Sequence, residues 1–170
     1  AAVLLLEDYG CQPQSETLDQ LLNALTVAAN LARDSVQQPQ FVQVGITAVQ
    51  QAKARGDYLT ALRYLHTVRQ LCLPDETQVQ LQLDLLQAEC AFLLGNLGQA
   101  WELCQQPLLA PGSLRDKAVA ACLLAEIQMR QSDLWLALDT IMGWLKVFGE
   151  PLHRHPTSEE CDAAWQVLQQ

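Results

Sequence analysis

Histidine is the side chain here best suited to acid–base or metal chemistry near neutral pH. His153 and His155 lie one residue apart just before Pro156, and His66 falls within an expected helix. Two histidines at this spacing can bind a metal on a strand, but no Cys or carboxylate pair is placed to complete four ligands. We interpret the pair as part of a solvated loop and His66 as a packed or rim residue. A metal site or a catalytic role is the alternative interpretation.

Paired carboxylates are the second candidate for chemistry, and they occur at Glu7/Asp8, Asp75/Glu76 and Glu159/Glu160. All stand at or near expected helix starts, where the helix dipole favours negative charge by about 0.3–1 kcal/mol. This structural role explains them better than acid–base catalysis.

The sequence also contains neither a Walker A motif nor a dinucleotide-binding fingerprint. We therefore predict no catalytic residue, no enzyme activity, no bound metal and no cofactor.

Six cysteines complete the set of reactive side chains, and no two of them have the CxxC spacing of a zinc or redox motif. Four lie among Leu and Ala at helical spacing and are expected to be small buried residues: Cys72, Cys90, Cys104 and Cys122. A disulfide framework is the disfavoured alternative. A reduced, cytoplasmic protein fits this usage best.

Composition excludes several classes of function. The 170 residues are 50% apolar and 17% charged, with a net charge of −9. Such a chain can fill a core, and its acidity argues against binding to nucleic acid or to an anionic membrane. No apolar run approaches the ~20 residues that span a bilayer. We expect a single domain, 1–170, and the apolar start without Met suggests a segment of a longer polypeptide.

The elements that would position any site are helices throughout. Leu, Ala and Gln dominate, and Gly and Pro lie mostly between blocks with apolar residues three and four apart. Expected N-caps are Asp75, Ser113, Ser132 or Asp133, and Thr157 with Glu160 as a capping box. Helices are predicted over residues 2–9, 16–36, 40–54, 58–72, 76–94, 97–106, 114–131, 133–148 and 158–169.

A repeated pattern links three of these blocks. Residues 56–65, 95–104 and 132–141 share a small residue, a large apolar residue two positions later, and an Ala three positions after that. The small residue would permit a tight turn between two helices, and the Ala would mark a close crossing of the pair. The small residues are Gly56, Gly95 and Ser132, and the alanines, 39 and 37 residues apart, are Ala61, Ala100 and Ala137.

These segments resemble the second half of a tetratricopeptide repeat, with Gly56, Tyr58 and Ala61 as the best match. The spacing exceeds the family period of about 34 residues, so helices or loops are longer. The resemblance implies an all-α fold, a right-handed stack of antiparallel helical hairpins forming a tetratricopeptide-like α-solenoid. The implied division is a stub (1–14), a leading helix (15–39), repeats at 40–74, 75–111 and 112–151, and a capping helix (157–170).

A second resemblance rests on residues 41–65, 83–95 and 137–152, the last reading A-L-D-T-I-M-G-W-L-K-V-F-G-E-P-L. These stretches are similar to the helical region of large bacterial signalling ATPases, in which an ATPase module precedes such helices and sensor histidine-kinase or transcription-regulator modules often follow. The resemblance implies an internal regulatory segment without the family's nucleotide-binding or phosphotransfer motifs.

In tetratricopeptide-type stacks the first helix of each pair lines the concave side. This implies a partner-binding surface at Gln43, Gln50, Lys53, Gln82, Glu89, Phe92, Glu126 and Arg130. The expected partner is a protein or a neighbouring domain of the same polypeptide, such as a basic or amphipathic helix. A small-ligand sensor is the alternative, with an apolar pocket between the helices at 114–131 and 133–148. We expect Trp101, Trp135 and Trp144 to pack in the core or between repeats, and Trp165 to cap the stack or face a missing neighbour.

Overall fold

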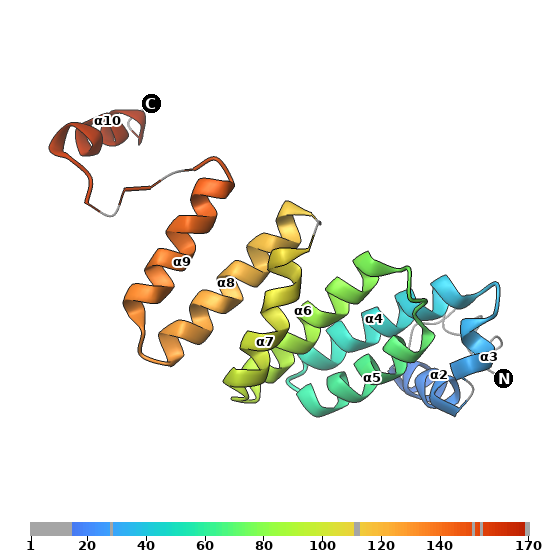
Figure 1. Cartoon of the computed structure of the whole chain (residues 1–170). Helices are drawn as coiled ribbons and strands as arrows, with labels where there is room; N and C mark the ends of the chain where they lie inside the picture. The colour runs from blue at the N-terminus through green and yellow to red at the C-terminus, as the bar shows by residue number, and fades with distance from the viewer. Residues whose placement is uncertain (1–14, 28, 111–112, 151, 154, 169–170) are drawn as a thin grey trace. The chain divides into compact units, whose positions relative to one another are not determined.

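The computed structural model describes residues 15–27, 29–110, 113–150, 152–153 and 155–168. The described residues form helices and contain no strand, which confirms the all-α prediction (Figure 1). In chain order the helices are α2 (Ser15–Val27), α3 (Ala29–Arg33), α4 (Gln38–Ala54), α5 (Tyr58–Leu71), α6 (Thr77–Leu93), α7 (Leu97–Leu109), α8 (Leu114–Arg130), α9 (Leu134–Val147) and α10 (Ser158–Leu168).

The chain divides into two compact units, residues 1–112 and 113–170. In the first unit, α4 packs on α5, α6 packs on α7, and α6 also contacts α4 and α5. In the second unit, α8 packs on α9. Across the described ranges, no helix is both long enough and apolar enough to cross a bilayer. The predicted stub at 1–14 lies outside the described residues.

The leading helix predicted over 15–39 ends earlier. Residues 34–37 leave the helical conformation, since α3 ends at Arg33 and α4 begins at Gln38. Pro39 lies in the first turn of α4, where its missing N–H removes no helical hydrogen bond, but Pro disfavours helical geometry in the residue before it. Ser35 stabilises the break, because its hydroxyl and its N–H both donate to the carbonyl oxygen of Ala32.

The three predicted hairpin turns have one shared geometry. Gly56, Gly95 and Ser132 have φ of 79°, 84° and 67°, in the left-handed region. The N–H of Gly56 donates to the carbonyl of Lys53 at 2.9 Å, and the next N–H, that of Asp57, donates to Ala52 at 3.0 Å. The same two bonds, from residues at matching positions, close the turns at Gly95 and Ser132. The repeat in the sequence is therefore a repeat of backbone conformation.

The three crossing alanines also occupy matching places. Ala61, Ala100 and Ala137 are buried, and each lies in the first turn of the second helix of its hairpin. Each N–H donates to the carbonyl of the residue that precedes the helix, at 3.0–3.1 Å. A larger side chain would have to displace the facing helix there.

Side-chain caps begin several of these helices, and those of Ser113 and Asp133 were predicted, whereas that of Asp57 was not. Asp57 Oδ1 accepts from the Thr60 N–H at 3.1 Å, and Asp133 Oδ1 accepts from Leu136 at 3.0 Å. Ser113 Oγ accepts from the Asp116 N–H at 3.2 Å. The predicted N-cap of α6 was wrong by one residue, because Glu76, and not Asp75, occupies the N-cap position.

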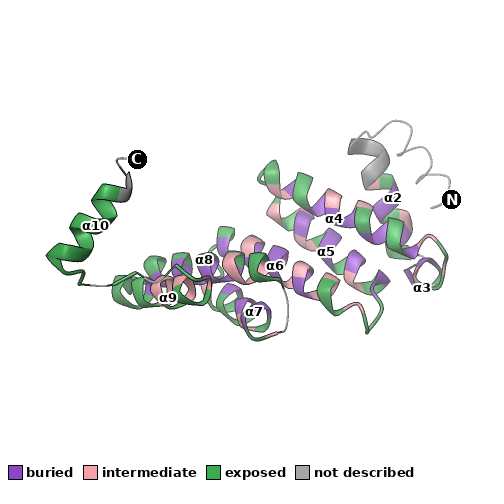
Figure 2. Cartoon of the chain, turned by 90° about the horizontal axis from the view of Figure 1, so that it is seen from above, coloured by how far each residue is buried: buried purple, intermediate pink, exposed green. Residues whose placement is uncertain are grey.

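The core of the first unit lies between α2, α3, α4, α5 and α6. Its largest fully buried side chains include Phe41, Leu21, Leu22, Leu25, Leu65 and Leu83. Gly45 allows α4 to approach α5 closely, since a Cβ there would collide with Val68 Cγ2. Figure 2 shows buried residues along these helices, whereas α9 is largely exposed and Ala137 is its buried residue.

Candidate functional site

Two of the predicted partner-binding residues contact one another. Lys53 Nζ on α4 forms an ion pair with Glu89 Oε2 on α6, and both side chains are partly exposed. Gln43 and Gln50 on α4 are exposed beside this pair along the helix, and Gln82 on α6 is half-buried. The first helices of two hairpins thus present a polar face with a charged pair toward the C-terminal ends of both helices, which we call the α4–α6 face.

Phe92 belongs to the same predicted set but is only 6% exposed. Its ring is therefore largely unavailable to a partner. The sequence pattern placed it one turn after Glu89, and a large apolar side chain at that position packs inward. Phe92 contributes to the support of the α4–α6 face and adds little to its surface.

A second set of polar contacts fixes α6 on the first hairpin. Arg69 Nη2 on α5 lies 2.5 Å from Asp84 Oδ1 and 2.9 Å from Gln87 Oε1, both on α6. Gln38 is buried at the start of α4, where its Nε2 donates to the Leu71 carbonyl and to Glu76 Oε2, each at 3.0 Å. These bonds hold the α5–α6 connection against α4.

The two remaining predicted residues, Glu126 and Arg130, lie exposed on α8 in the second unit. They are four residues apart, so they share one face of that helix. The predicted set is therefore divided between the α4–α6 face and one face of α8.

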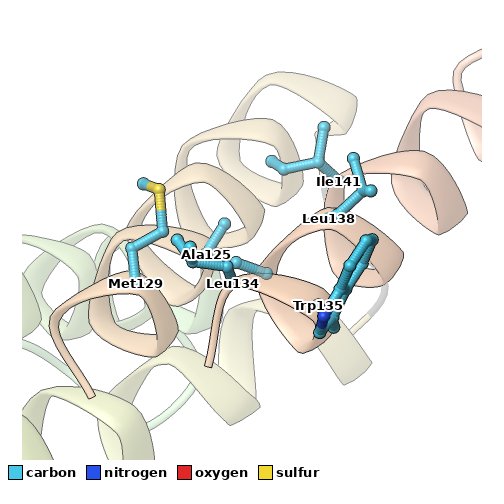
Figure 3. A pocket seen from close by; sticks show the side chains of 7 residues that line it. Ala125, Met129, Leu134, Trp135, Leu138 and Ile141 are labelled. Atoms are coloured by element: carbon cyan, nitrogen blue, oxygen red, sulfur yellow. The ribbon is translucent and has the colours of Figure 1, made fainter. Parts of the chain in front are cut away.

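An apolar groove of about 530 Å³ lies between α8 and α9 (Figure 3). Its walls are Met129 and Ala125 on α8 and a row of α9 side chains: Leu134, Trp135, Leu138 and Ile141. From the sequence we predicted a pocket between these two helices as the alternative function, but we did not identify the residues that line it. The sequence feature that could have identified them is the run of five apolar residues from Leu134 to Leu138. Consecutive apolar residues face several sides of a helix, and contact with one partner helix buries only one of these sides.

The histidines lie in exposed positions. His66, His153 and His155 are all exposed, and His66 Nε2 lies 3.0 Å from Gln70 Nε2. His153 Nε2 lies 3.7 Å from Glu160 Oε1. In the part of the chain that the structure describes, no three His, Cys, Asp or Glu side chains gather as they would to hold a metal ion.

The described carboxylate pairs have structural partners. Glu76 Oε2 accepts from the Leu73 N–H at 2.7 Å as well as from Gln38. Glu160 Oε2 accepts from the Thr157 N–H at 2.8 Å, and Thr157 Oγ1 accepts from the Glu160 N–H at 3.3 Å, which confirms the capping box. The hydrogen bond from the Thr157 backbone is the main cause that lowers the pKa of Glu160. The pair Glu7/Asp8 lies outside the described residues.

Three of the four cysteines predicted to be buried are so: Cys72, Cys90 and Cys104. Burial raises the pKa of Cys72 and of Cys104 to about 11, and it raises that of Cys90 as well. The prediction for Cys122 was wrong, because this thiol is exposed on α8. Cys161 on α10 is also an exposed free thiol.

The tryptophans differ most from expectation. Trp101, Trp135 and Trp165 are exposed, whereas the sequence placed the first two in packed positions. Trp144 is half-buried, and its ring centroid lies 6.0 Å from that of Phe148, one turn further on. Exposed indole rings are a feature of binding surfaces, since Trp is enriched at interfaces.

Comparison with protein-family models, with curated proteins and with solved structures finds no significant match to this chain.

Proposed function

We propose that this chain is a non-catalytic protein–protein interaction or regulatory scaffold module within a larger cytoplasmic signalling protein. The observation that carries the proposal is the Lys53–Glu89 ion pair, which joins the first helices of two hairpins on a partly exposed polar face. A face of this kind is held in place by the hairpins behind it, so it can bind a partner without large rearrangement. The recurring turns at Gly56, Gly95 and Ser132 support the same proposal, because repeated hairpins serve widely as binding scaffolds.

Charge indicates the class of partner. The chain carries a net charge of −9; Glu89 lies on the α4–α6 face, and Glu126 is exposed on α8. A basic or amphipathic helix, from another protein or from a neighbouring domain of the same polypeptide, complements such a surface. The resemblance of residues 41–65, 83–95 and 137–152 to the helical region of bacterial signalling ATPases supports a place between an ATPase module and a sensor or transcription-regulator module.

Fluorescence anisotropy with labelled helical peptides tests the proposal. A basic amphipathic peptide is expected to bind, and an acidic peptide of equal length and hydrophobicity is expected not to bind. Glu89→Gln and Glu126→Lys should each weaken binding of the basic peptide by about ten-fold. Glu102→Lys is the matched control, because Glu102 is exposed on α7, a second helix of a hairpin. If Glu89→Gln and Glu126→Lys both bind as the unaltered chain does, or if Glu102→Lys weakens binding to the same extent, the surface assignment is wrong.

The α8–α9 groove favours a second candidate function, a small-ligand sensor. Its volume of about 530 Å³ falls within the ~300–1,000 Å³ of ligand pockets, and its lining side chains are apolar. An apolar ligand bound there would raise the melting temperature of the chain. A thermal-shift screen with apolar compounds tests this function, and a hit should lose its effect in Leu138→Glu, which puts a charge into the groove.

A further inference from the structure

One helix of the second unit exposes an apolar face. On α9, Leu134 and Trp135 are 65% and 67% exposed, and Leu138 is also exposed. With Ile141 they form one wall of the α8–α9 groove (Figure 3). An exposed apolar surface of this kind normally marks a place where another element packs.

The first hairpin shows how the matching face is covered. Counted from the crossing alanines, Leu138 and Ile141 of α9 correspond to Leu62 and Leu65 of α5. Leu65 is buried and Leu62 is packed against the core of the first unit. That core includes α6, which contributes a stripe with spacings of four and three residues: Val79, Leu83 and Leu86. α5 is also contacted by α2 and α3, so amphipathic helices packed around it, α6 among them, cover this hairpin.

The sequence of α10 has an apolar stripe with the same spacings of four and three residues, at Cys161, Trp165 and Leu168. Cys161 and Trp165 lie four residues apart and therefore share one face of the helix. Cys161 and Trp165 are exposed. α10 has 11 residues, and helices shorter than about 12–15 residues are marginal in water without tertiary packing. Its capping box and apolar stripe therefore call for a surface on which the helix packs.

The connection from α9 to α10 favours a return along α9. Gly149 has φ of 89°, and its N–H donates to Lys146 while that of Glu150 donates to Leu145. The same bond pattern starts the chain reversal at Gly56, Gly95 and Ser132. Ten residues, 148–157, separate the two helices, and at ~3.3 Å per residue they can span up to about 33 Å.

We propose that α10 packs in the α8–α9 groove of its own chain, with Cys161 and Trp165 against Leu138 and Ile141. It would cover part of α9, as α6 covers part of α5. Lys146, in the last turn of α9, and the acidic first turn of α10, with Glu159 and Glu160, add a favourable charge match to this packing. The groove then has an occupant that any partner helix or ligand must displace.

The reactivity of the Cys161 thiol in the full chain tests the proposal. Modification by a maleimide is followed site by site with mass spectrometry, and a synthetic peptide of residues 156–170 gives the rate for the unprotected thiol. In the full chain Cys161 should react at least about ten-fold more slowly than in the peptide, because a docked helix must open first. Leu138→Glu should bring the rate to within about two-fold of the peptide, since a charge in the groove weakens apolar packing.

Val147→Glu is the matched control. It introduces the same charge on α9 nine residues further on, half a turn out of phase with Leu138, and it should leave Cys161 protected. Trp165→Ala provides an independent variant on α10 and should also release the thiol. A peptide-like rate for Cys161 in the unaltered chain would overturn the proposal. So would protection that disappears on dilution together with a dimer seen by sedimentation, because the occupant would then be α10 of a second copy.

Discussion

Ser132 holds, at φ 67°, the left-handed backbone conformation that Gly56 holds at φ 79° in the first hairpin. A side chain makes this conformation unfavourable by roughly 1–2 kcal/mol, because Cβ approaches the following carbonyl oxygen. Ser132→Gly should therefore raise the free energy of unfolding by about 1 kcal/mol. Gly56→Ala should lower it by about the same amount, although the added methyl group would have no neighbour within 4 Å. Urea denaturation measures both changes.

Gly143→Ala is the control for this pair of variants. Gly143 lies within α9, and a Cβ there also has no neighbour within 4 Å. Since Ala favours a helix interior over Gly by about 0.5–1 kcal/mol, this variant should be more stable. A stabilising effect of Gly56→Ala would contradict the turn geometry.

Gly45→Ala should destabilise the first unit through a collision. The new methyl group would overlap Val68 Cγ2 across the α4–α5 contact, and the branched Val68 side chain has little rotational freedom to move away. Overpacking of this kind costs about 1–3 kcal/mol. The measurement is a urea-denaturation double-mutant cycle with Val68→Ala, in which the two changes should offset one another in part. Strict additivity would show that α4 and α5 are further apart.

The Arg69–Asp84 pair should contribute measurably to stability, whereas the Arg33–Asp34 pair should not. The side chains of the first pair are 34% and 19% exposed, and those of the second are 41% and 75% exposed. Less solvent around the first pair means less screening, and we expect a coupling free energy of about 1 kcal/mol for it and close to zero for the second. Double-mutant cycles to Ala at low and high salt measure both values. Equal couplings would contradict the role of Arg69 in holding α6.

Thiol reactivity should separate the buried cysteines from Cys122. Burial raises the pKa of Cys72 and Cys104 to about 11, so both remain protonated and shielded at pH 8.5. Cys122, exposed on α8, should react readily. Because the folded pKa is the higher one, the stability that the two thiols contribute is present below pH 9 and is lost as the pH rises towards 11. Thiol labelling and urea titrations between pH 8 and 11 check both expectations. Labelling of Cys104 at the rate of Cys122 would contradict its burial.

Features set by local sequence were predictable. The turns at Gly56 and Gly95, the buried Ala61 and the capping box of Thr157 and Glu160 depend on residues within one or two helical turns, so short motifs specify them. The extent of α7 was less predictable. The sequence indicated an end at 106, but the helix continues through Pro107 to Leu109, since a buried Pro removes one hydrogen bond while its ring still packs.

Features that depend on a neighbour were not predictable. The apolar surroundings of Cys122 and Trp135 in the sequence indicated burial, but both side chains are exposed. Helical periodicity identifies which face of a helix is apolar and leaves open which element packs on it. For the same reason the pocket between α8 and α9 was predictable as a place, whereas its lining by Trp135 and Met129 was not.

The tight turns also have a consequence for how the chain acquires its structure. Only three residues separate α4 from α5, α6 from α7, and α8 from α9. Contacts between such helices join residues that are close along the chain, and proteins with low contact order fold in microseconds to milliseconds. Each hairpin can therefore form early, and a slower event is the one that brings α6 onto the α4–α5 hairpin.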